Sequence, residues 1–137
     1  MPYKNITVAL AGKEDEIPMI DEAVRLSITL KAKLTVLHVN SPHAGKMSMM
    51  MDSPKKYVKE DFIKMFHNAG HEEMAKVLQI KIVENKSISN GIAEMAEDCD
   101  LLIMGHDRMG KMKELMTDSI DEIIGNKVNC PVLIISK

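Results

Sequence analysis

The chain has 137 residues, of which 45% are hydrophobic and 28% are charged, and its formal net charge at neutral pH is −2. These values are typical of a globular protein, and they give no electrostatic reason to expect nucleic acid or an anionic membrane as a partner. The apolar runs are far shorter than the roughly 20 residues that cross a bilayer, and residues 1–10 contain no secretion signal. We therefore expect a single domain over residues 1–137, located in the cytoplasm.

The first part of the chain alternates a short β-rich run with a helical period. Residues 5–10 (NITVAL) and 33–39 (KLTVLHV) are apolar runs that predict two buried strands. Between them, Pro18 stands at the expected first turn of a helix, and Asp21 and Arg25 are spaced to pair on its outer side. The apolar side of this helix comprises Ile17, Ile20, Val24 and Ile28.

A loop over residues 40–54 precedes a long helical stretch that begins near Lys55. Gly70 falls on its buried stripe, so we expect this glycine to permit close packing rather than to end the helix. The stripe consists of Val58, Phe62, Phe66, Gly70, Met74 and Val77.

Three further strands are predicted at residues 78–84, 101–105 and 131–136. Ser87 or Ser89 caps the helix between the first two, and another helix, with Ile120, Ile123 and Ile124, separates the last two. This alternation predicts an α/β fold with a parallel sheet covered by helices on both faces. Ligands of such sheets bind beyond the carboxyl ends of the strands, so the loops to inspect are residues 11–16, 40–54 and 106–118.

Several side chains with metal or redox chemistry stand outside these elements. Cys99 and Cys130 are too few for a disulfide framework, so we expect buried reduced thiols, with a redox pair as the alternative. His67 and His71 lie four apart but lack an evident third metal ligand, and we expect a solvated helix face there. A methionine cluster near His43 favours a lid or a partner-facing patch, with copper handling as the alternative. It consists of Met47, Met49, Met50 and Met51.

Four stretches of the chain carry a resemblance that extends over nearly its whole length. They are NITVAL before a glycine-containing turn, LTVLHV, DLLIMG and the final SIDEIIGNKVNCPVLIISK. The last, a helix followed by Cys-Pro and a short apolar strand, is the most specific. With these features the chain resembles the universal stress protein family. The resemblance implies a Rossmann-like sheet of five parallel strands in the order 3-2-1-4-5, a cytoplasmic homodimer, a structural role for His38, and, in many members, binding of ATP or a related nucleotide.

The nucleotide-binding members of that family carry a Gly-x2-Gly-x9-Gly-Ser/Thr motif after the fourth strand. On this sequence the motif begins at Gly105 and ends at Ser119, but Arg108 and Asp118 replace the second and third glycines. Matching HDRMG to the family's usual pattern instead places Asp107 at the second position. The family also places an aspartate after the first strand, where this chain has Ala11.

These replacements remove features that a polyphosphate needs. Glycines let backbone N–H groups approach phosphate oxygens, and a carboxylate at the start of the last helix would itself satisfy the positive end of that helix. Asp118 is therefore interpreted as a structural cap, with a residual anion site as the alternative. The candidate nucleotide- or anion-binding residues are Ala11, Gly12, Val39, Asn40, Gly105, His106, Arg108, Lys111, Asp118 and Ser119.

We hypothesise that the chain keeps the stress-protein scaffold and has lost the family's mode of ATP binding. It would act in a regulatory or interaction role in the stress response, with no cofactor, no metal and no catalytic activity. The alternatives are a sensor that binds ATP or AMP and a slow nucleotide hydrolase. The last strand, an exposed apolar edge, predicts a two-fold dimer, and a protein partner is a further expectation. The candidate dimer interface comprises Pro131, Val132, Leu133, Ile134 and Ile135.

Overall fold

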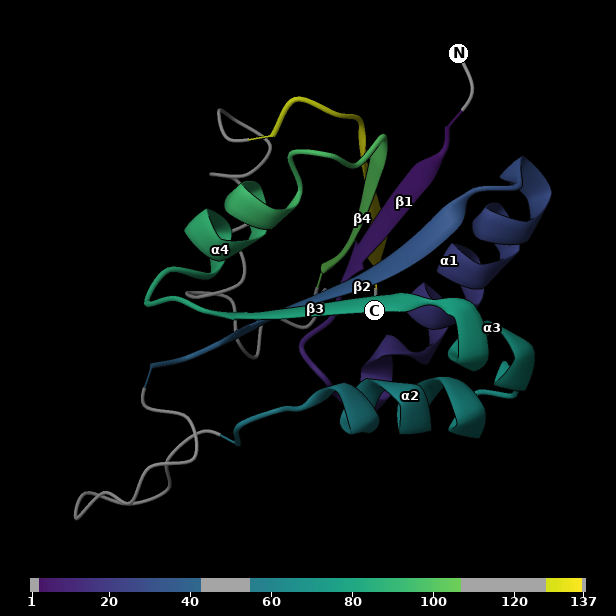
Figure 1. Ribbon diagram of the computed structural model, residues 1–137, viewed down its shortest axis with the longest axis horizontal. Coiled ribbons are helices and arrows are strands. Elements are labelled where there is room, and N and C mark those ends of the chain that lie inside the picture. The colour runs from purple at the N-terminus through teal and green to yellow at the C-terminus, as the bar shows by residue number, and fades with distance from the viewer. Residues whose placement is uncertain (1–2, 43–54, 107–127, 137) are drawn as a thin grey trace.

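Five parallel strands form one sheet at the centre of the protein (Figure 1). The computed structural model describes residues 3–42, 55–106 and 128–136. The strands are β1 (Asn5–Ala9), β2 (Lys33–Asn40), β3 (Gln79–Glu84), β4 (Leu101–His106) and β5 (Val132–Ser136). Their order is β3-β2-β1-β4-β5, which confirms the predicted fold class and places β5 at an edge.

Helices cover both faces of this sheet. They are the 3-10 turn η1 (Glu14–Glu16) and the helices α1 (Ile17–Leu30), α2 (Lys59–Asn68), α3 (Glu72–Val77) and α4 (Ile88–Met95). The first three α-helices lie on one side and α4 lies on the other (Figure 1). Phe62 and Phe66 are fully buried in the larger core, and Ile92 anchors the smaller core under α4. Among the described residues, no helix has both the length and the apolar character needed to cross a bilayer.

The long helix predicted after Lys55 is in fact two helices, and Gly70 separates them. Gly70 adopts a φ of +88°, a left-handed conformation that glycine reaches without strain. Its N–H donates to the His67 carbonyl at 3.0 Å, and the N–H of His71 donates to the Phe66 carbonyl at 2.8 Å. This pair of bonds is a Schellman motif, the usual way in which a glycine ends a helix. The expectation that Gly70 lies inside a continuous helix was therefore wrong.

The outer side of α1 also differs from the prediction. Arg25 pairs with Glu22, three positions before it, and Asp21 instead contacts His71, with 2.8 Å between its Oδ1 and the ring Nε2. The predicted apolar stripes include residues that are not buried: the side chain of Ile28 is 65% exposed and that of Val77 is 74% exposed. The predicted cap of α4 is confirmed at Ser87, whose hydroxyl accepts the N–H of Asn90.

The sheet topology brings the ends of β1, β2 and β4 to one edge. β1 pairs with both β2 and β4, so the strand order reverses beside it. The chain leaves β1 through α1 on one face, and it enters β4 from α4 on the other (Figure 1). Parallel sheets of this kind form their ligand crevice at such a reversal. The reversal lies between β1 and β4, and the described residues nearest to it are those that follow β1 and the neighbouring β2, so the site is sought there.

Candidate functional site

The loop after β1 folds around a carboxylate from its own chain. Glu16 is only 2% exposed, and its carboxylate accepts hydrogen bonds from three consecutive backbone N–H groups. The nitrogen-to-oxygen distances are 2.8 Å from Ala11, 2.8 Å from Gly12 and 3.0 Å from Lys13. Successive N–H groups that converge in this way form a concave anion-binding nest. Here the nest already holds an anion, and its donors are used.

An aromatic ring covers the same loop. Gly12 has a φ of +93°, and a Cβ atom built on it would lie 2.3 Å from Cε2 of Tyr57. The ring of Tyr57 therefore packs directly against the Gly12 backbone, in the space that any side chain at this position would fill. Tyr57 also packs against His38 and Phe62, with ring centroids 4.7 Å and 5.7 Å away. This stacking continues the larger core up to the carboxyl edge of the sheet.

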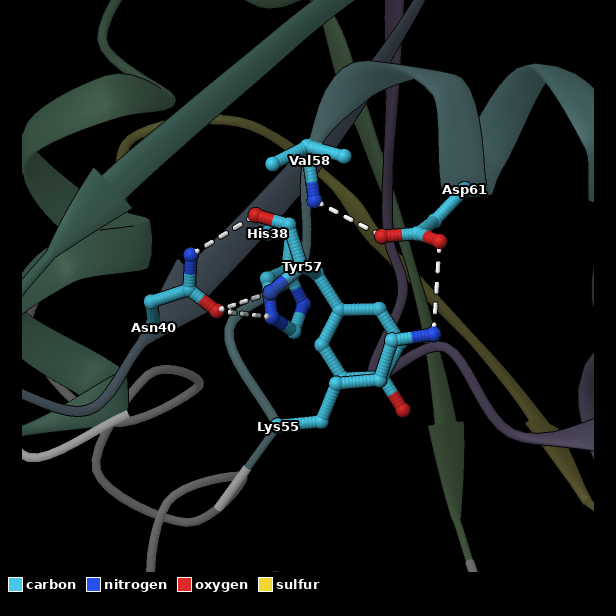
Figure 2. A network of polar contacts seen from close by, with 6 residues as sticks. All are labelled: His38, Asn40, Lys55, Tyr57, Val58 and Asp61. Carbon is cyan, nitrogen blue, oxygen red and sulfur yellow. Dashed lines mark hydrogen bonds and ion pairs between the residues drawn. The ribbon is translucent and has the colours of Figure 1, made fainter. Parts of the chain in front are cut away.

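Asn40, at the end of β2, fixes the segment that carries this ring. Its side-chain amide donates to the Tyr57 carbonyl at 3.0 Å, and its side-chain oxygen accepts the Tyr57 N–H at 3.1 Å (Figure 2). Because these backbone groups are a fixed acceptor and a fixed donor, they determine the orientation of the Asn40 amide. The polar side chain at the end of β2 therefore binds the protein's own backbone.

His38 completes this network from beneath. The ring is buried, with Nδ1 2.7 Å from the Leu10 carbonyl oxygen and Nε2 3.0 Å from the Asn40 side-chain oxygen. Each ring nitrogen thus lies within hydrogen-bonding distance of an oxygen, one on the backbone and one on a side chain. The expected structural role of His38 agrees with these contacts, which tie β1 to β2 and both to the Tyr57 segment.

A charged pair holds the outer end of the same segment. The Lys55 ammonium lies 3.3 Å from Asp61 and 4.9 Å from the centroid of the Tyr57 ring (Figure 2). The other Asp61 oxygen accepts the Val58 N–H at 2.8 Å, at the start of α2. This backbone hydrogen bond, followed by the Lys55 ammonium, lowers the pKa of Asp61 below its usual value. Asp61 therefore stays ionised at neutral pH and anchors the entry to α2.

The structure brings some of the predicted site residues together and leaves others outside its described part. Ala11 and Gly12 contribute backbone amides to the nest, whereas Asn40 contributes its side chain to the Tyr57 segment. Val39 turns toward the other face, where its methyl groups would lie 2.8 Å from a Cβ on Gly91. Gly105 and His106 end β4, beside β5. The candidates Arg108, Lys111, Asp118 and Ser119 lie outside the described residues.

The other candidate residues have different environments. His71 contacts Asp21, and in the part of the chain that the structure describes no group of three histidine, cysteine or acidic residues could hold a metal ion. Cys99 and Cys130 are both free and half-buried. The methionine cluster and His43 lie outside the described residues, as does the predicted helix with Ile120, Ile123 and Ile124. The candidate interface residues are β5 and the proline before it; the four strand residues are half-buried and Pro131 is exposed.

Comparison with known proteins gives the family. The sequence profile described as "Universal stress protein family" matches residues 2–136. The chain belongs to the universal stress protein family. Universal stress protein YxiE of Bacillus subtilis is 25% identical over 146 residues, a match that covers 97% of this chain and 99% of that protein.

Solved structures of universal stress proteins share this fold over nearly the whole chain. One, solved in complex with cAMP, superposes with a TM-score of 0.63 at 15% identity and covers 99% of this chain and 98% of its own. Another, from Archaeoglobus fulgidus in complex with dAMP, has a TM-score of 0.62 at 19% identity, with 98% and 99% covered. At these identities the likeness establishes the fold alone.

The sequence analysis missed two residues at the carboxyl edge of this universal stress protein's sheet, Glu16 and Tyr57. Glu16 stands three residues after Lys13, just before the helix that Pro18 opens, and that spacing is the acidic half of a capping box. It was a readable signal for a carboxylate that returns to the preceding loop. Tyr57 carried no comparable signal, because its place over Gly12 depends on contacts with Asn40 that are 17 positions away.

Proposed function

We propose that this universal stress protein acts as a cytoplasmic, non-enzymatic regulatory or interaction protein that does not bind ATP in the manner of its nucleotide-binding relatives. The observation that carries the proposal is the Glu16 carboxylate seated in the amides of the β1 loop. Backbone donors at this edge of the sheet are what a ligand would need, and an internal anion already uses them.

The charge and the shape of the β1 loop also oppose nucleotide binding. A nucleotide that approaches the β1 loop meets the Tyr57 ring, which lies against Gly12, and the carboxylate of Glu16, which already accepts the Gly12 N–H. Two unit negative charges at about 4 Å repel by about 1 kcal/mol in water and about 4 kcal/mol near a protein surface. A second internal carboxylate, Asp118, is part of the same proposal and rests on the sequence alone. Together the two carboxylates would leave few hydrogen-bond donors free to bind a polyphosphate.

Nucleotide sensing is the competing function, and the solved relatives with cAMP and dAMP favour it. In that case Tyr57 would not block the site. It would offer its ring to an adenine base, a contact that contributes about 1–3 kcal/mol for each stacked base. The two proposals therefore assign opposite effects to the same side chain, and one substitution separates them.

The test is isothermal titration of ATP and cAMP into the full-length protein, its Tyr57→Ala variant and its Tyr3→Ala variant. Tyr3 is the chain's other tyrosine and precedes β1, so it serves as a matched control. We expect no binding to the wild type or to Tyr3→Ala, and removal of a blocking Tyr57 ring should leave binding absent or allow weak binding. Saturable binding to wild type that is weakened by Tyr57→Ala and retained by Tyr3→Ala would overturn the proposal in favour of a sensor.

The homodimer belongs to the same proposal. β5 is an edge strand whose residues 132–135 are half-buried, and an apolar edge of this kind invites pairing with another chain. A two-fold contact between β5 of one chain and β5 of a second copy would cover the β5 edge of both chains. Sedimentation equilibrium over a wide concentration range should give twice the mass of one chain, whereas a monomer throughout that range would refute this part.

A further inference from the structure

The two cysteines meet at the amino ends of neighbouring strands. Cys99 lies just before β4 and Cys130 just before β5, and their sulfurs are 3.2 Å apart although 31 positions separate them in the sequence. The sheet register sets this proximity, because Leu102 pairs with Val132 and the N–H of Leu102 donates to the Pro131 carbonyl at 3.0 Å. The thiols are therefore held side by side by the strands that follow them.

Both thiols are only partly buried, so a small reagent can approach them from solvent. Both cysteines are half-buried at the rim of the core under α4. A surface hollow of about 190 Å³ lies near this part of the chain; it is lined by residues of α4, of the turn after it and of the stretch before Cys130, but by neither cysteine. Its lining includes Glu94 and Glu97, so the hollow favours a neutral reagent over an anionic one.

The two thiols differ in their readiness to react. Burial, followed by the contact with Cys130, raises the pKa of Cys99 to about 12, so Cys99 keeps its proton at neutral pH. Asp98 and Asp100 flank Cys99 in the sequence, whereas Cys130 lies between Asn129 and Pro131. Because the thiolate is the nucleophile in cysteine chemistry, the two acidic neighbours disfavour attack by Cys99, and we assign the first attack to Cys130.

We propose that Cys99 and Cys130 form an oxidant-sensitive dithiol that a neutral hydroperoxide closes to an intramolecular disulfide. The Cys130 sulfur attacks the peroxide, the O–O bond breaks, and Cys130 sulfenic acid and an alcohol, or water, are released. The Cys99 sulfur then attacks the Cys130 sulfur, loses its proton and expels water. In total the two thiols give up two protons and two electrons, and these reduce the hydroperoxide to an alcohol, or water, and one further water. The sulfurs have to move from 3.2 Å to about 2.05 Å for the bond to form.

The disulfide would fasten β5 to the start of β4. It closes a chain segment of 31 positions that includes the stretch from Gly105 to Ser119. Cross-linking a loop of this length restricts the unfolded chain, and we expect the oxidised protein to melt higher than the reduced one by on the order of 10 °C. Because β5 is also the strand proposed to pair in the dimer, oxidation would stiffen that edge.

The experiment treats the reduced, full-length protein with hydrogen peroxide and, separately, with oxidised glutathione. We expect both free thiols to disappear together, the intact mass to fall by two hydrogens, and the product to run as a single chain on a non-reducing gel. Dithiothreitol should restore both thiols. Hydrogen peroxide should react faster than the anionic glutathione disulfide.

Two variants make the order of attack testable. With a sulfenic-acid trap present, Cys99→Ser should accumulate an adduct on Cys130, and Cys130→Ser should accumulate none on Cys99. The melting temperature of each reduced variant checks that it is folded. Survival of both thiols in folded protein under peroxide that oxidises the denatured chain, or oxidation only to sulfinic acid or to intermolecular dimers, would overturn the proposal. An adduct on Cys99 alone would overturn the assigned order.

Discussion

Replacing Glu16 tests whether an internal carboxylate holds the β1 loop. The carboxylate accepts three backbone N–H groups at 2.8–3.0 Å and is 2% exposed, so Glu16→Ala leaves three donors without their partner. Each buried donor left unsatisfied costs about 1–3 kcal/mol, and water admitted to the partly buried loop recovers some of this. We expect Glu16→Ala to lose about 3 kcal/mol of unfolding free energy. Glu16→Gln, which keeps one acceptor oxygen, should lose about half as much.

Urea unfolding measures this loss directly, as a lower midpoint with an unchanged slope. Unfolding entropy of about 2.1 cal/mol/K per residue converts 3 kcal/mol into a melting temperature about 10 °C lower for a chain of this size. Glu14→Ala is the matched control, because Glu14 is an exposed glutamate on the same turn. We expect it to change stability by no more than about 0.5 kcal/mol. Equal effects of the two substitutions would refute the role assigned to the buried carboxylate.

Three further predictions follow from single positions. Gly12→Ala should destabilise by about 2 kcal/mol or more through both its φ of +93° and the clash with the Tyr57 ring. Gly70→Ala, with a φ of +88° but open space around it, should lose only about 1 kcal/mol, and equal losses would refute the clash. Asp100 accepts two backbone N–H groups near the start of β1, which lowers its pKa. Its contribution to stability is therefore full above about pH 4 and is lost as the pH falls through the lowered pKa. Asp100→Asn should be less stable than wild type at neutral pH, and that difference should disappear in acid; a difference that persists there would contradict the assignment.

The fold was accessible from the sequence because its elements follow local rules. Apolar runs such as residues 5–10 alternate with helical periods, and that alternation alone predicts a parallel sheet covered on both faces. The strand order came from the family resemblance, since periodicity carries no information on which strands are neighbours. The error at Gly70 has a local cause: a glycine on an apolar stripe fits either a packed helix or a helix end, and only the conformation decides between them.

The candidate site was harder to predict from the sequence, because its arrangement depends on side chains that form hydrogen bonds with backbone groups of the same chain. The sequence indicated which loops meet at the strand ends, and Ala11, Gly12 and Asn40 do lie there. The use of their polar groups within the chain was missed for two reasons: the local spacing of Glu16 was overlooked, and Tyr57 reaches Asn40 from 17 positions away. The sequence shows that Ala11 replaces the family's aspartate after the first strand. It does not show whether the loop there is open to a ligand or closed by another side chain of the same chain.

The central claim is that the site is closed to adenine nucleotides, and the ultraviolet spectrum of the freshly purified protein tests it most directly. The chain has two tyrosines and no tryptophan, so even a single co-purified adenine nucleotide per chain would dominate its absorbance. We predict that acid denaturation releases no adenine-absorbing material into the supernatant. Recovery of ATP, AMP or cAMP in a one-to-one ratio with the chain would contradict the account.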